Sequence, residues 1–397
     1  MKEHILIIGG GFLQVPVIEQ AQDMGFKTIV MDMNLNAPGI LLADVPLIIS
    51  TKDVDLAVRA AKIQNRITPI QGVLTVGTDV SVTVATIATE LELPGILPKV
   101  AYYATNKHCM KYTLSENNVP CANYHNTHYL ELAIKGANAI GYPVVIKPDE
   151  SMGARGVIRI NNDEELQYAF RQAMAYAYHE VIIEEYIEGP ELSIDAVIYN
   201  NEIFITGIAD RIITPHPKYF VEIGHTMPSQ LSIEQQNAAI DVFKQGIKAL
   251  DINHGCAKGD IKITAKGAMV GEIAARLSGG FMSTHTYPLS TGVNLMKAAI
   301  NLAIGEPPGD LTPVHSKVAI ERALVADTEG ILKELRFEEP IEDIEGIYLT
   351  KKTGSWVAPP KNNVEKLGHI IAVADTLEEA EKAIENSKKY IRIRIES

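Results

Sequence analysis

Residues 141–157 read Gly-Tyr-Pro-Val-Val-Ile-Lys-Pro-Asp-Glu-Ser-Met-Gly-Ala-Arg-Gly-Val. The β-branched run predicts a short buried strand that delivers Lys147 at its end, where Pro148 stops the strand. The polar loop that follows carries two glycines and Arg155, and small loop residues let backbone N–H groups approach phosphate oxygens. A strand-end lysine beside such a loop indicates a mobile lid over an anionic ligand, with an ordinary glycine-rich hairpin as the alternative.

A second pattern lies downstream, at residues 181–195. A buried strand runs into Glu184 and Glu185, and a Gly-Pro break then precedes a second, alternating strand. This combination of lysine, glycine loop and acidic hinge resembles the ATP-grasp superfamily, which includes D-alanine:D-alanine ligase, biotin carboxylase and glycinamide ribonucleotide synthetase. The resemblance implies that the protein binds ATP.

The resemblance also implies a role for each matching residue. Lys147 and an earlier lysine, Lys107, would contact the phosphates, and Arg155 would stabilise the transferred phosphoryl group. Adenine would be bound largely through the backbone of the hinge at 184–187, and the ribose hydroxyls by the acid after the Gly-Pro break. The nucleotide-binding residues expected in this way are Lys107, Lys147, Ser151, Gly153, Gly156, Glu184, Glu185, Ile187 and Glu191.

A possible metal site lies in residues 259–280. Two alternating strands, joined by a turn near Gly267, are expected to bring Asp260 and Glu272 opposite each other. Paired carboxylates can hold Mg²⁺ against phosphate oxygens, so we predict Mg²⁺ here, with Mn²⁺ as an alternative. In most of the superfamily the second strand reads Glu-x-Asn-x-Arg, whereas Ala274 replaces the asparagine in this chain. The number of metal ions is therefore left open.

Arg276 ends this motif, and its planar guanidinium suits a carboxylate or an acyl phosphate. We predict a catalytic arginine, with a structural salt bridge as the alternative. Upstream, residues 222–229 resemble a segment of L-amino acid ligases in which an acid and a histidine face the substrate. The substrate residues implied in this way are Glu222, His225, Arg276, Ser278 and Gly279.

The chain of 397 residues predicts two to three domains. Residues 1–98 read as a Rossmann-like unit of the kind that precedes an ATP-grasp domain, with further strands at 47–50 and 72–76. Its glycine motif, Gly-x-Gly-x-x-Gln, is incomplete for NAD, so we expect no NAD site. Residues 99–309 should form the ATP-grasp domain, with a lid at about 115–190. Residues 310–397 resemble the small α+β domain of L-amino acid ligases, which makes the fold class α/β and α+β.

Composition limits the partners. A net charge of −13 argues against nucleic acid and anionic membrane surfaces, which select basic faces. Three cysteines without a paired spacing indicate a reducing cytoplasm, and Cys121, His125 and His128 lack further ligands for a tetrahedral metal site. No stretch holds eighteen uninterrupted apolar residues, so we expect no membrane span. Small molecules are the expected partners, and a homodimer is an option because related ligases are often dimers.

Together the motifs predict an ATP-dependent carboxylate–amine ligase that acts on amino acids. ATP would phosphorylate a carboxylate, and an amine would attack the acyl phosphate to give an amide or peptide bond, ADP and phosphate. One alternative is a carboxylase-type enzyme that makes carboxyphosphate from bicarbonate. The other is a nucleotide-binding module without turnover, which would not need Asp260, Glu272 and Arg276 together.

Overall fold

The computed structural model describes residues 3–338, 341 and 343–396. The amino-terminal unit is a parallel sheet with the strand order β3-β2-β1-β4. Its strands are β1 (His4–Ile8), β2 (Lys27–Met31), β3 (Val45–Leu47) and β4 (Ile70–Leu74), and its helices are α1 (Val15–Asp23), α2 (Pro38–Leu42), α3 (Val54–Ile67) and α4 (Ser81–Glu90). The predicted Rossmann-like pattern is confirmed, with the third and fourth strands starting two residues earlier than expected.

The glycine turn after β1 is fixed by the protein itself. The Gly10 N–H donates to Asp32 Oδ2 at 2.9 Å, and the Gly11 N–H donates to Gln14 Oε1 at 2.8 Å. Gln14, which stands where a dinucleotide motif has a small residue, therefore occupies the turn with its own side chain.

The region predicted as the lid, at about 115–190, contains an antiparallel sheet with the order β5-β8-β6-β7. Helices α5 (Pro98–Tyr103) and α6 (Lys107–Glu116) lead into it, and α7 (Leu130–Ile140) and α8 (Asp163–Met174) pack against it. Its strands are β5 (Tyr124–Thr127), β6 (Val144–Pro148), β7 (Ile158–Ile160) and β8 (Val181–Glu185). Asn162 caps α8 by accepting from the Glu165 N–H, and Leu166 and Phe170 bury the apolar face of that helix.

The central sheet has eight strands, all antiparallel to their neighbours, in the order β13-β12-β9-β10-β11-β14-β18-β16. Its strands are β9 (Glu191–Tyr199), β10 (Glu202–Ile213), β11 (Glu222–Met227), β12 (Gly255–Thr264), β13 (Gly267–Ala274), β14 (Val318–Leu324), β16 (Ile344–Leu349) and β18 (Gly368–Ala374). The helices after β11 and β13 are α9 (Ile233–Ala249), α10 (Tyr287–Thr291), which follows a π-helical turn at Met282–Thr286, and α11 (Leu295–Ala303). Helix α9 covers β12 and β13, and buries Phe243 and Ile247 in the core there.

The carboxyl-terminal unit shares this central sheet, because β14, β18 and β16 continue it. A second, three-stranded sheet holds β15 (Gly330–Phe337), β17 (Trp356–Val357) and β19 (Ile391–Glu396), and α12 (Leu377–Ser387) packs on β18 and β14. The predicted capping box between Thr376 and Glu379 opens α12. The domain boundary predicted at residue 98 falls at the start of α5, and the boundary predicted at residue 309 falls between α11 and β14. The division into three domains stays a prediction.

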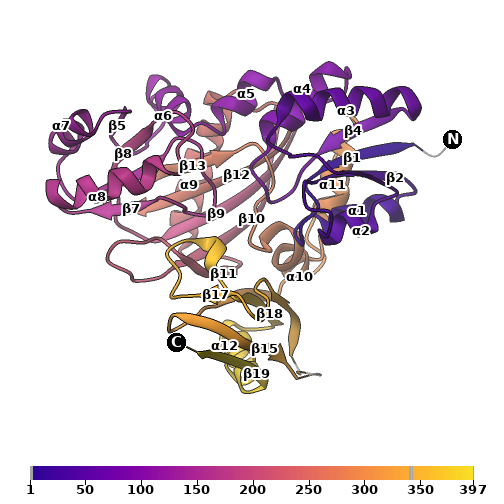
Figure 1. Cartoon of the computed structure of the whole chain (residues 1–397). Coiled ribbons are helices and arrows are strands. Elements are labelled where there is room, and N and C mark those ends of the chain that lie inside the picture. Colours follow the sequence, from indigo (N-terminus) through magenta and orange to yellow (C-terminus); the bar gives the residue numbers. More distant parts are fainter. Residues whose placement is uncertain (1–2, 339–340, 342, 397) are drawn as a thin grey trace.

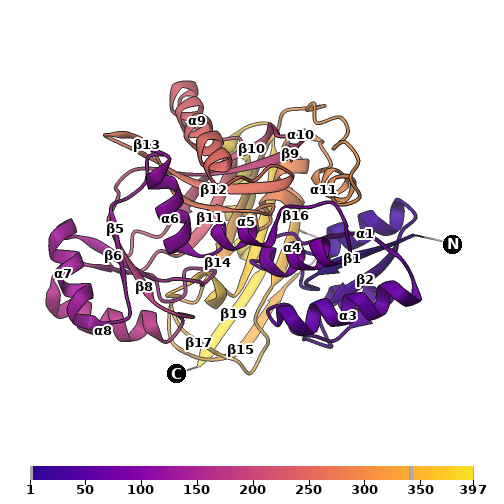
Figure 2. The ribbon, with the colours of Figure 1, turned by 90° about the horizontal axis from the view of Figure 1, so that it is seen from above.

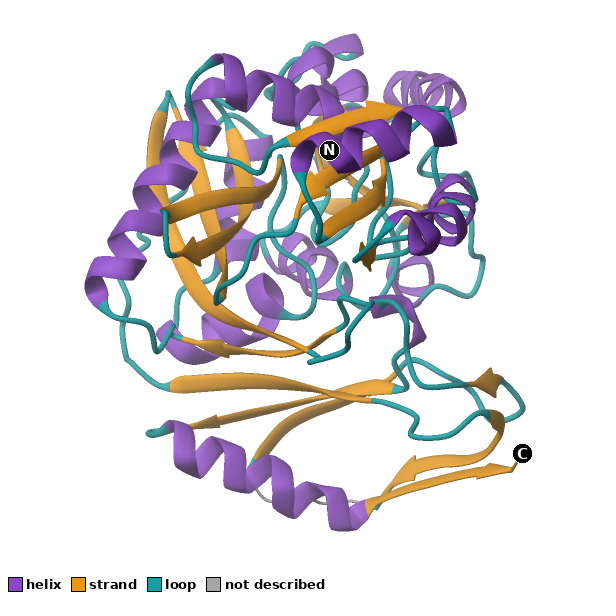
Figure 3. Ribbon diagram, turned by 90° about the vertical axis from the view of Figure 1, so that its left-hand side faces the viewer, coloured by secondary structure: helices purple, strands orange, loops and turns teal. Residues whose placement is uncertain are grey.

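The units surround the central sheet. Figures 1 and 2 show the amino-terminal unit and the lid at opposite ends of the molecule. Figures 1 and 3 show the carboxyl-terminal unit as a layer below both, with α12 near its lower edge. Among the described residues, no helix is long and apolar enough to cross a bilayer.

Candidate active site

A cavity of about 610 Å³ is lined by the amino-terminal unit, the lid, the central sheet and the carboxyl-terminal unit. This volume is typical of a site for a small molecule. All predicted site residues except Arg155 and Gly156 line it. Those that the structure brings together are Lys107, Lys147, Ser151, Gly153, Glu184, Glu185, Ile187, Glu191, Glu222, His225, Asp260, Glu272, Arg276, Ser278 and Gly279.

Arg155 and Gly156 instead shape the glycine loop. Arg155 Nε donates to the Met152 carbonyl at 3.1 Å, which turns the guanidinium back onto its own loop. Gly156 has φ +73°, and a Cβ there would lie 2.9 Å from a side-chain carbon of Pro148. The structure thus differs from the expectation that both residues face the ligand, and neighbours in the loop explain the difference.

Two lysines from different elements converge at the lid side of the cavity. Lys107 opens α6 and donates to the Ser151 carbonyl at 3.0 Å, so it ties the helix to the glycine loop. Lys147 lies near the end of β6, and its Nζ lies 2.8 Å from Glu184 Oε2. Burial disfavours a charged amine, but Glu184 outweighs burial and keeps the pKa of Lys147 raised. Two cationic side chains at one end of a cavity suit a phosphate chain.

Glu184 is the buried carboxylate that neutralises these lysines. Its side chain is 5 % exposed, lies 3.6 Å from Lys111 Nζ, and has a pKa that Lys111 and Lys147 lower against the effect of burial. The Glu184 carboxylate therefore contacts basic side chains. If Glu184 contacts adenine, as expected for the hinge at 184–187, it would do so through its backbone. Lys111 was not predicted, although its position four residues after Lys107 places both on one face of α6.

Removal of this carboxylate should destabilise the protein. We expect Glu184→Gln to lower the free energy of unfolding by about 3–5 kcal/mol, because Lys111, 1 % exposed, would lose its buried counter-charge. The pKa of Glu184 is lowered in the folded state, so its contribution is complete above the ordinary value of 4.5 and is lost as the pH falls through the folded value.

Chemical unfolding of wild type and Glu184→Gln from about pH 7 down to about pH 3 would measure the stability difference at neutral pH and its loss below 4.5. Glu185→Gln is the matched control. The Glu185 carboxylate pairs with the largely exposed Lys266 and accepts from the Asn123 side-chain amide at 3.0 Å, so the loss of its charge should cost less than about 1 kcal/mol. Equal stability of Glu184→Gln and wild type at pH 7 would show that Glu184 is not the counter-charge that Lys111 needs.

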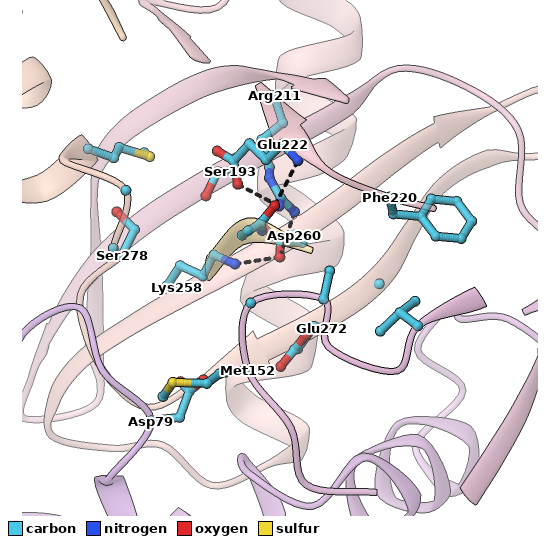
Figure 4. Close-up of a pocket in the computed structure, with 18 of the residues that line it drawn as sticks. Asp79, Met152, Ser193, Arg211, Phe220, Glu222, Lys258, Asp260, Glu272 and Ser278 are labelled. Carbon is cyan, nitrogen blue, oxygen red and sulfur yellow. Dashed lines mark hydrogen bonds and ion pairs between the residues drawn. The ribbon is translucent and has the colours of Figure 1, made fainter. Parts of the chain in front are cut away.

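Asp260 and Glu272 lie opposite each other. The β12–β13 register pairs these two residues directly, as predicted from the sequence. Asp260 Oδ2 lies 2.8 Å from Arg211 NH1 and forms an ion pair with Lys258, while Arg211 also binds Glu222 (Figure 4). The basic partners Arg211 and Lys258 hold the pKa of Asp260 below its ordinary value although burial raises it.

This pair can accommodate a divalent cation. Within the part of the chain that the structure describes, Asp260 Oδ1 is buried without a hydrogen-bond partner, so one carboxylate oxygen remains available, and Glu272 lies opposite Asp260 across the strands. Among the described residues no group of three or more histidine, cysteine, aspartate or glutamate side chains forms a complete protein cage. Two carboxylates without such a cage fit Mg²⁺, which commonly takes one or two carboxylates together with substrate phosphates and waters.

Arg276 follows β13 and is held by the amino-terminal unit. It forms an ion pair with Asp79, and its NH1 donates to the Leu277 carbonyl at 3.0 Å. Burial opposes its charge, but Asp79 keeps the pKa of Arg276 raised. Ser278, two residues further on, donates two hydrogen bonds to the Asp195 carboxylate, one from its backbone N–H and one from its hydroxyl. Burial raises the pKa of Asp195 to about 6. These bonds fix the Arg276–Gly280 segment at the cavity wall, and the catalytic role of Arg276 stays a prediction.

Glu222 and His225 lie on β11, which pairs with β10 on one side and β14 on the other. Glu222 Oε2 accepts from Arg211 at 2.8 Å, and Arg211 lowers its pKa to about 2 against the effect of burial. His225 is 2 % exposed, and its Nε2 lies 2.7 Å from Thr286 Oγ1. Burial lowers the pKa of His225, so the cavity is lined by a neutral imidazole where β11 borders it. Further lining residues that were not predicted as site residues are Asp79, Arg211, Lys258, Thr350, Asn363, Lys366 and His369.

Comparison with protein families identifies two parts of the chain. Residues 140–285 match the ATP-grasp domain, and residues 322–396 match L-amino acid ligase C-terminal domain 2. The first of these segments contains the glycine loop, both predicted metal ligands and Arg276. The second contains Lys366 and His369.

Individual proteins are also similar to this chain, two in sequence and one in fold. An uncharacterized protein of Sinorhizobium fredii is 28 % identical over 81 % of this chain and 68 % of its own length. A formate-dependent phosphoribosylglycinamide formyltransferase of Sulfurisphaera tokodaii is 23 % identical over 98 % of this chain and 97 % of its own. The crystal structure of an L-amino acid ligase from Bacillus licheniformis has a TM-score of 0.86 at 21 % identity, covering 100 % of this chain and 99 % of that one. The chain therefore contains an ATP-grasp domain, followed by a segment that matches the C-terminal domain of L-amino acid ligases.

Proposed function

We propose that this protein is a carboxylate–amine ligase that joins amino acids through an acyl phosphate, with release of ADP and phosphate. One observation supports this most directly. Lys107, Lys147, Arg276 and the opposed carboxylates of β12 and β13 all line one cavity. This set supplies cations for a phosphate chain, a place for Mg²⁺, and a planar donor for an activated carboxylate. The L-amino acid ligase C-terminal domain supports amino acids as the substrate class.

Each group would act at a defined step. Lys107 and Lys147 would bind the phosphates of ATP and stabilise charge on the transferred phosphoryl group. Asp260 and Glu272 would hold Mg²⁺, which neutralises phosphate charge when it is bound. The substrate carboxylate oxygen would attack the terminal phosphorus, and ADP would leave.

The second step forms the new bond. A neutral amine would attack the acyl carbon, phosphate would leave, and the amine would lose a proton to give the amide. Arg276 would stabilise the oxyanion that forms on the carbonyl. The glycine loop, which Lys107 bonds through Ser151, would exclude water that hydrolyses the acyl phosphate.

Phosphate release tests this proposal. Purified protein with ATP and Mg²⁺ should release phosphate only when certain amino acids are present, and added hydroxylamine should convert the activated carboxylate to a hydroxamate. Release that depends on bicarbonate or formate, with no response to any amino acid, would overturn the amino acid assignment. Absence of release with every carboxylate, despite ATP binding, would favour the nucleotide-binding module.

Nucleotide choice gives a separate prediction. Mg-ATP or an unhydrolysable analogue should raise the melting temperature, because the lysines of the cavity bind it in the native state only. NAD should leave the melting temperature unchanged, since Gln14 fills the glycine turn. Differential scanning fluorimetry with both nucleotides decides between them, and stabilisation by NAD alone would contradict the account.

We also propose that the enzyme works in the cytoplasm on small molecules. The three cysteines, Cys109, Cys121 and Cys256, are unpaired in the structure, as a reducing compartment would keep them. A homodimer stays a prediction.

A further inference from the structure

His369 and Glu321 form a buried pair beside the cavity. His369 lies on β18 and lines the cavity, and Glu321 lies on the neighbouring strand β14 and is 1 % exposed. His369 Nδ1 lies 2.6 Å from Glu321 Oε1. Burial opposes the charge of Glu321, but the hydrogen bond with His369 lowers its pKa, so the carboxylate is ionised at neutral pH.

This contact determines which ring nitrogen of His369 carries the hydrogen. An ionised carboxylate can only accept a hydrogen bond, so Nδ1 must be the donor. In the neutral imidazole, Nε2 then carries the lone pair and can accept a proton. A buried carboxylate that holds a histidine in this tautomer also stabilises the imidazolium that forms when Nε2 is protonated. The pair therefore has the arrangement of a general base.

The other histidine that lines the cavity, His225, is arranged differently. Its Nε2 lies 2.7 Å from Thr286 Oγ1, and that hydroxyl donates to the Met282 carbonyl at 3.3 Å. Nε2 of His225 is therefore a donor, and Nδ1 lies 3.6 Å from Glu321 Oε2. Both ring nitrogens of His225 thus lie beside protein groups, which leaves this histidine less suited to take a proton from a substrate.

The carboxylates of the cavity are weak bases, because cations accompany them. A neighbouring cation favours the charged form of a carboxylate and so opposes its protonation. The ion pairs are Asp79–Arg276, Glu184–Lys111, Glu184–Lys147, Glu185–Lys266, Glu191–Arg211, Glu191–Lys262, Glu222–Arg211, Asp260–Arg211, Asp260–Lys258 and Glu272–Lys107. His369 differs from all of these groups, since a carboxylate is the partner of its ring.

His369 also lies next to the segment that begins with Arg276. Phe281, five residues after Arg276, lines the cavity, and its ring centroid lies 4.9 Å from that of His369. Phe281 has φ +70°, a left-handed conformation that a bulky residue adopts only where its surroundings hold it. Its ring packs against His285 and Tyr348 as well, with centroids 5.1 and 4.5 Å away. This aromatic cluster connects the imidazole of His369 to the wall where Arg276 is proposed to act.

We propose that His369 is the general base that removes a proton from the ammonium group of the amine substrate, and that Glu321 positions it. The proposal rests on the proposed function and adds the group that prepares the nucleophile. An ammonium nitrogen has no lone pair, so it must lose one proton before it can attack, and His369 Nε2 accepts that proton.

The remaining bonds then change in one order. The nitrogen lone pair forms the bond to the acyl carbon, and the bond between that carbon and the phosphate oxygen breaks. Phosphate leaves with the electron pair of the broken bond and takes the second proton from the nitrogen. The imidazolium of His369 returns its proton to solvent before the next turnover.

Hydroxylamine separates this role from a structural one, because it is largely neutral near pH 7 and needs no base. Wild type and His369→Gln are compared in two reactions of the same activated acid, ligation to an amino acid and formation of the hydroxamate. Ligation by His369→Gln should fall by about a hundredfold or more, with hydroxamate formation nearly unchanged. His128→Gln is the matched control, because that histidine is 55 % exposed on the lid, and both of its reactions should match wild type.

The pH dependence gives a second readout. Ligation by His369→Gln should recover toward wild type as the pH rises from about 7 to about 9, because more of the amine is then neutral without a base. The other titratable or charged groups around His369 occur in both proteins, so they affect both rates: Glu321 on β14, Tyr348 on β16, His225 on β11, His285 in the π-helical turn and Lys366 before β18. A deficit that stays constant with pH would overturn the proposal.

Other outcomes would also overturn it. Equal ligation by wild type and His369→Gln would show that another group takes the proton, and a parallel loss of amide and hydroxamate would make His369 a structural residue. Both results leave the proposed function intact, since wild type still ligates. If wild type releases no phosphate with any amino acid, the proposed function fails and the general base fails with it.

Melting temperatures show whether the variants fold. If His369→Gln does not fold, Glu321→Gln provides the same comparison, because it keeps the shape of the side chain but removes the charge that positions His369. Slow ligation with normal hydroxamate formation in Glu321→Gln would support the proposal, and unchanged ligation would overturn it.

Discussion

Arg276→Lys is expected to fold and bind ATP normally, yet to ligate at least about a hundredfold more slowly than wild type. In the structure the guanidinium binds Asp79 and the Leu277 carbonyl at the same time and still lines the cavity. A lysine keeps the charge but has one donor group on a flexible stem, so it cannot hold Asp79 and an acyl phosphate in a fixed plane. Steady-state ligation, with ATP affinity measured separately, checks this expectation.

A control variant tests whether replacing any arginine by lysine slows ligation. Arg336 is 61 % exposed and pairs with Glu334, so Arg336→Lys should ligate like wild type. If a stably folded Arg276→Lys protein ligates at the wild-type rate, Arg276 is a structural arginine that joins the amino-terminal unit to the central sheet, and another group must stabilise the acyl phosphate.

Glu272→Gln should reduce turnover by at least about a hundredfold and raise the Mg²⁺ concentration needed for half-maximal rate. The substitution keeps the shape of the side chain but removes the charge that faces Asp260 across the strands. Nucleotide binding without metal should change little, because Glu272 is partly exposed and its ion pair with Lys107 is long, at 3.8 Å. Titration of the rate with Mg²⁺, beside nucleotide binding in a chelator, measures both effects.

The corresponding control removes a carboxylate outside the cavity. Glu202 is exposed at the start of β10, and Glu202→Gln should leave the Mg²⁺ dependence unchanged. Unaltered Mg²⁺ dependence and turnover in Glu272→Gln would show that the metal is held elsewhere.

Local features could be predicted from the sequence where a few neighbouring residues are enough to determine the structure. The strand that ends near Lys147, the β12–β13 hairpin that opposes Asp260 and Glu272, and the capping box at Thr376 each depend on neighbours within a few residues. Turn chemistry and alternation are sufficient to define such elements.

Features that depend on distant contacts could not be predicted in the same way. The segment with Glu222 and His225 is a strand because β10 and β14 pair with it from both sides, and no pattern within the segment itself indicates this. The ion pair of Asp79 with Arg276 spans two units of the chain, and Lys366 reaches the cavity only because β18 joins the central sheet. Among the additional residues, Lys111 had a local signal, its spacing from Lys107.

Transfer of heavy oxygen tests the central claim, activation of a carboxylate by ATP, most directly. The accepted amino acid is labelled with heavy oxygen in its carboxylate, and the phosphate released during ligation is examined by mass spectrometry. An acyl phosphate intermediate requires each phosphate to carry one oxygen from that carboxylate, so we predict singly labelled phosphate in step with product. Unlabelled phosphate, or release of AMP and pyrophosphate, would contradict the account.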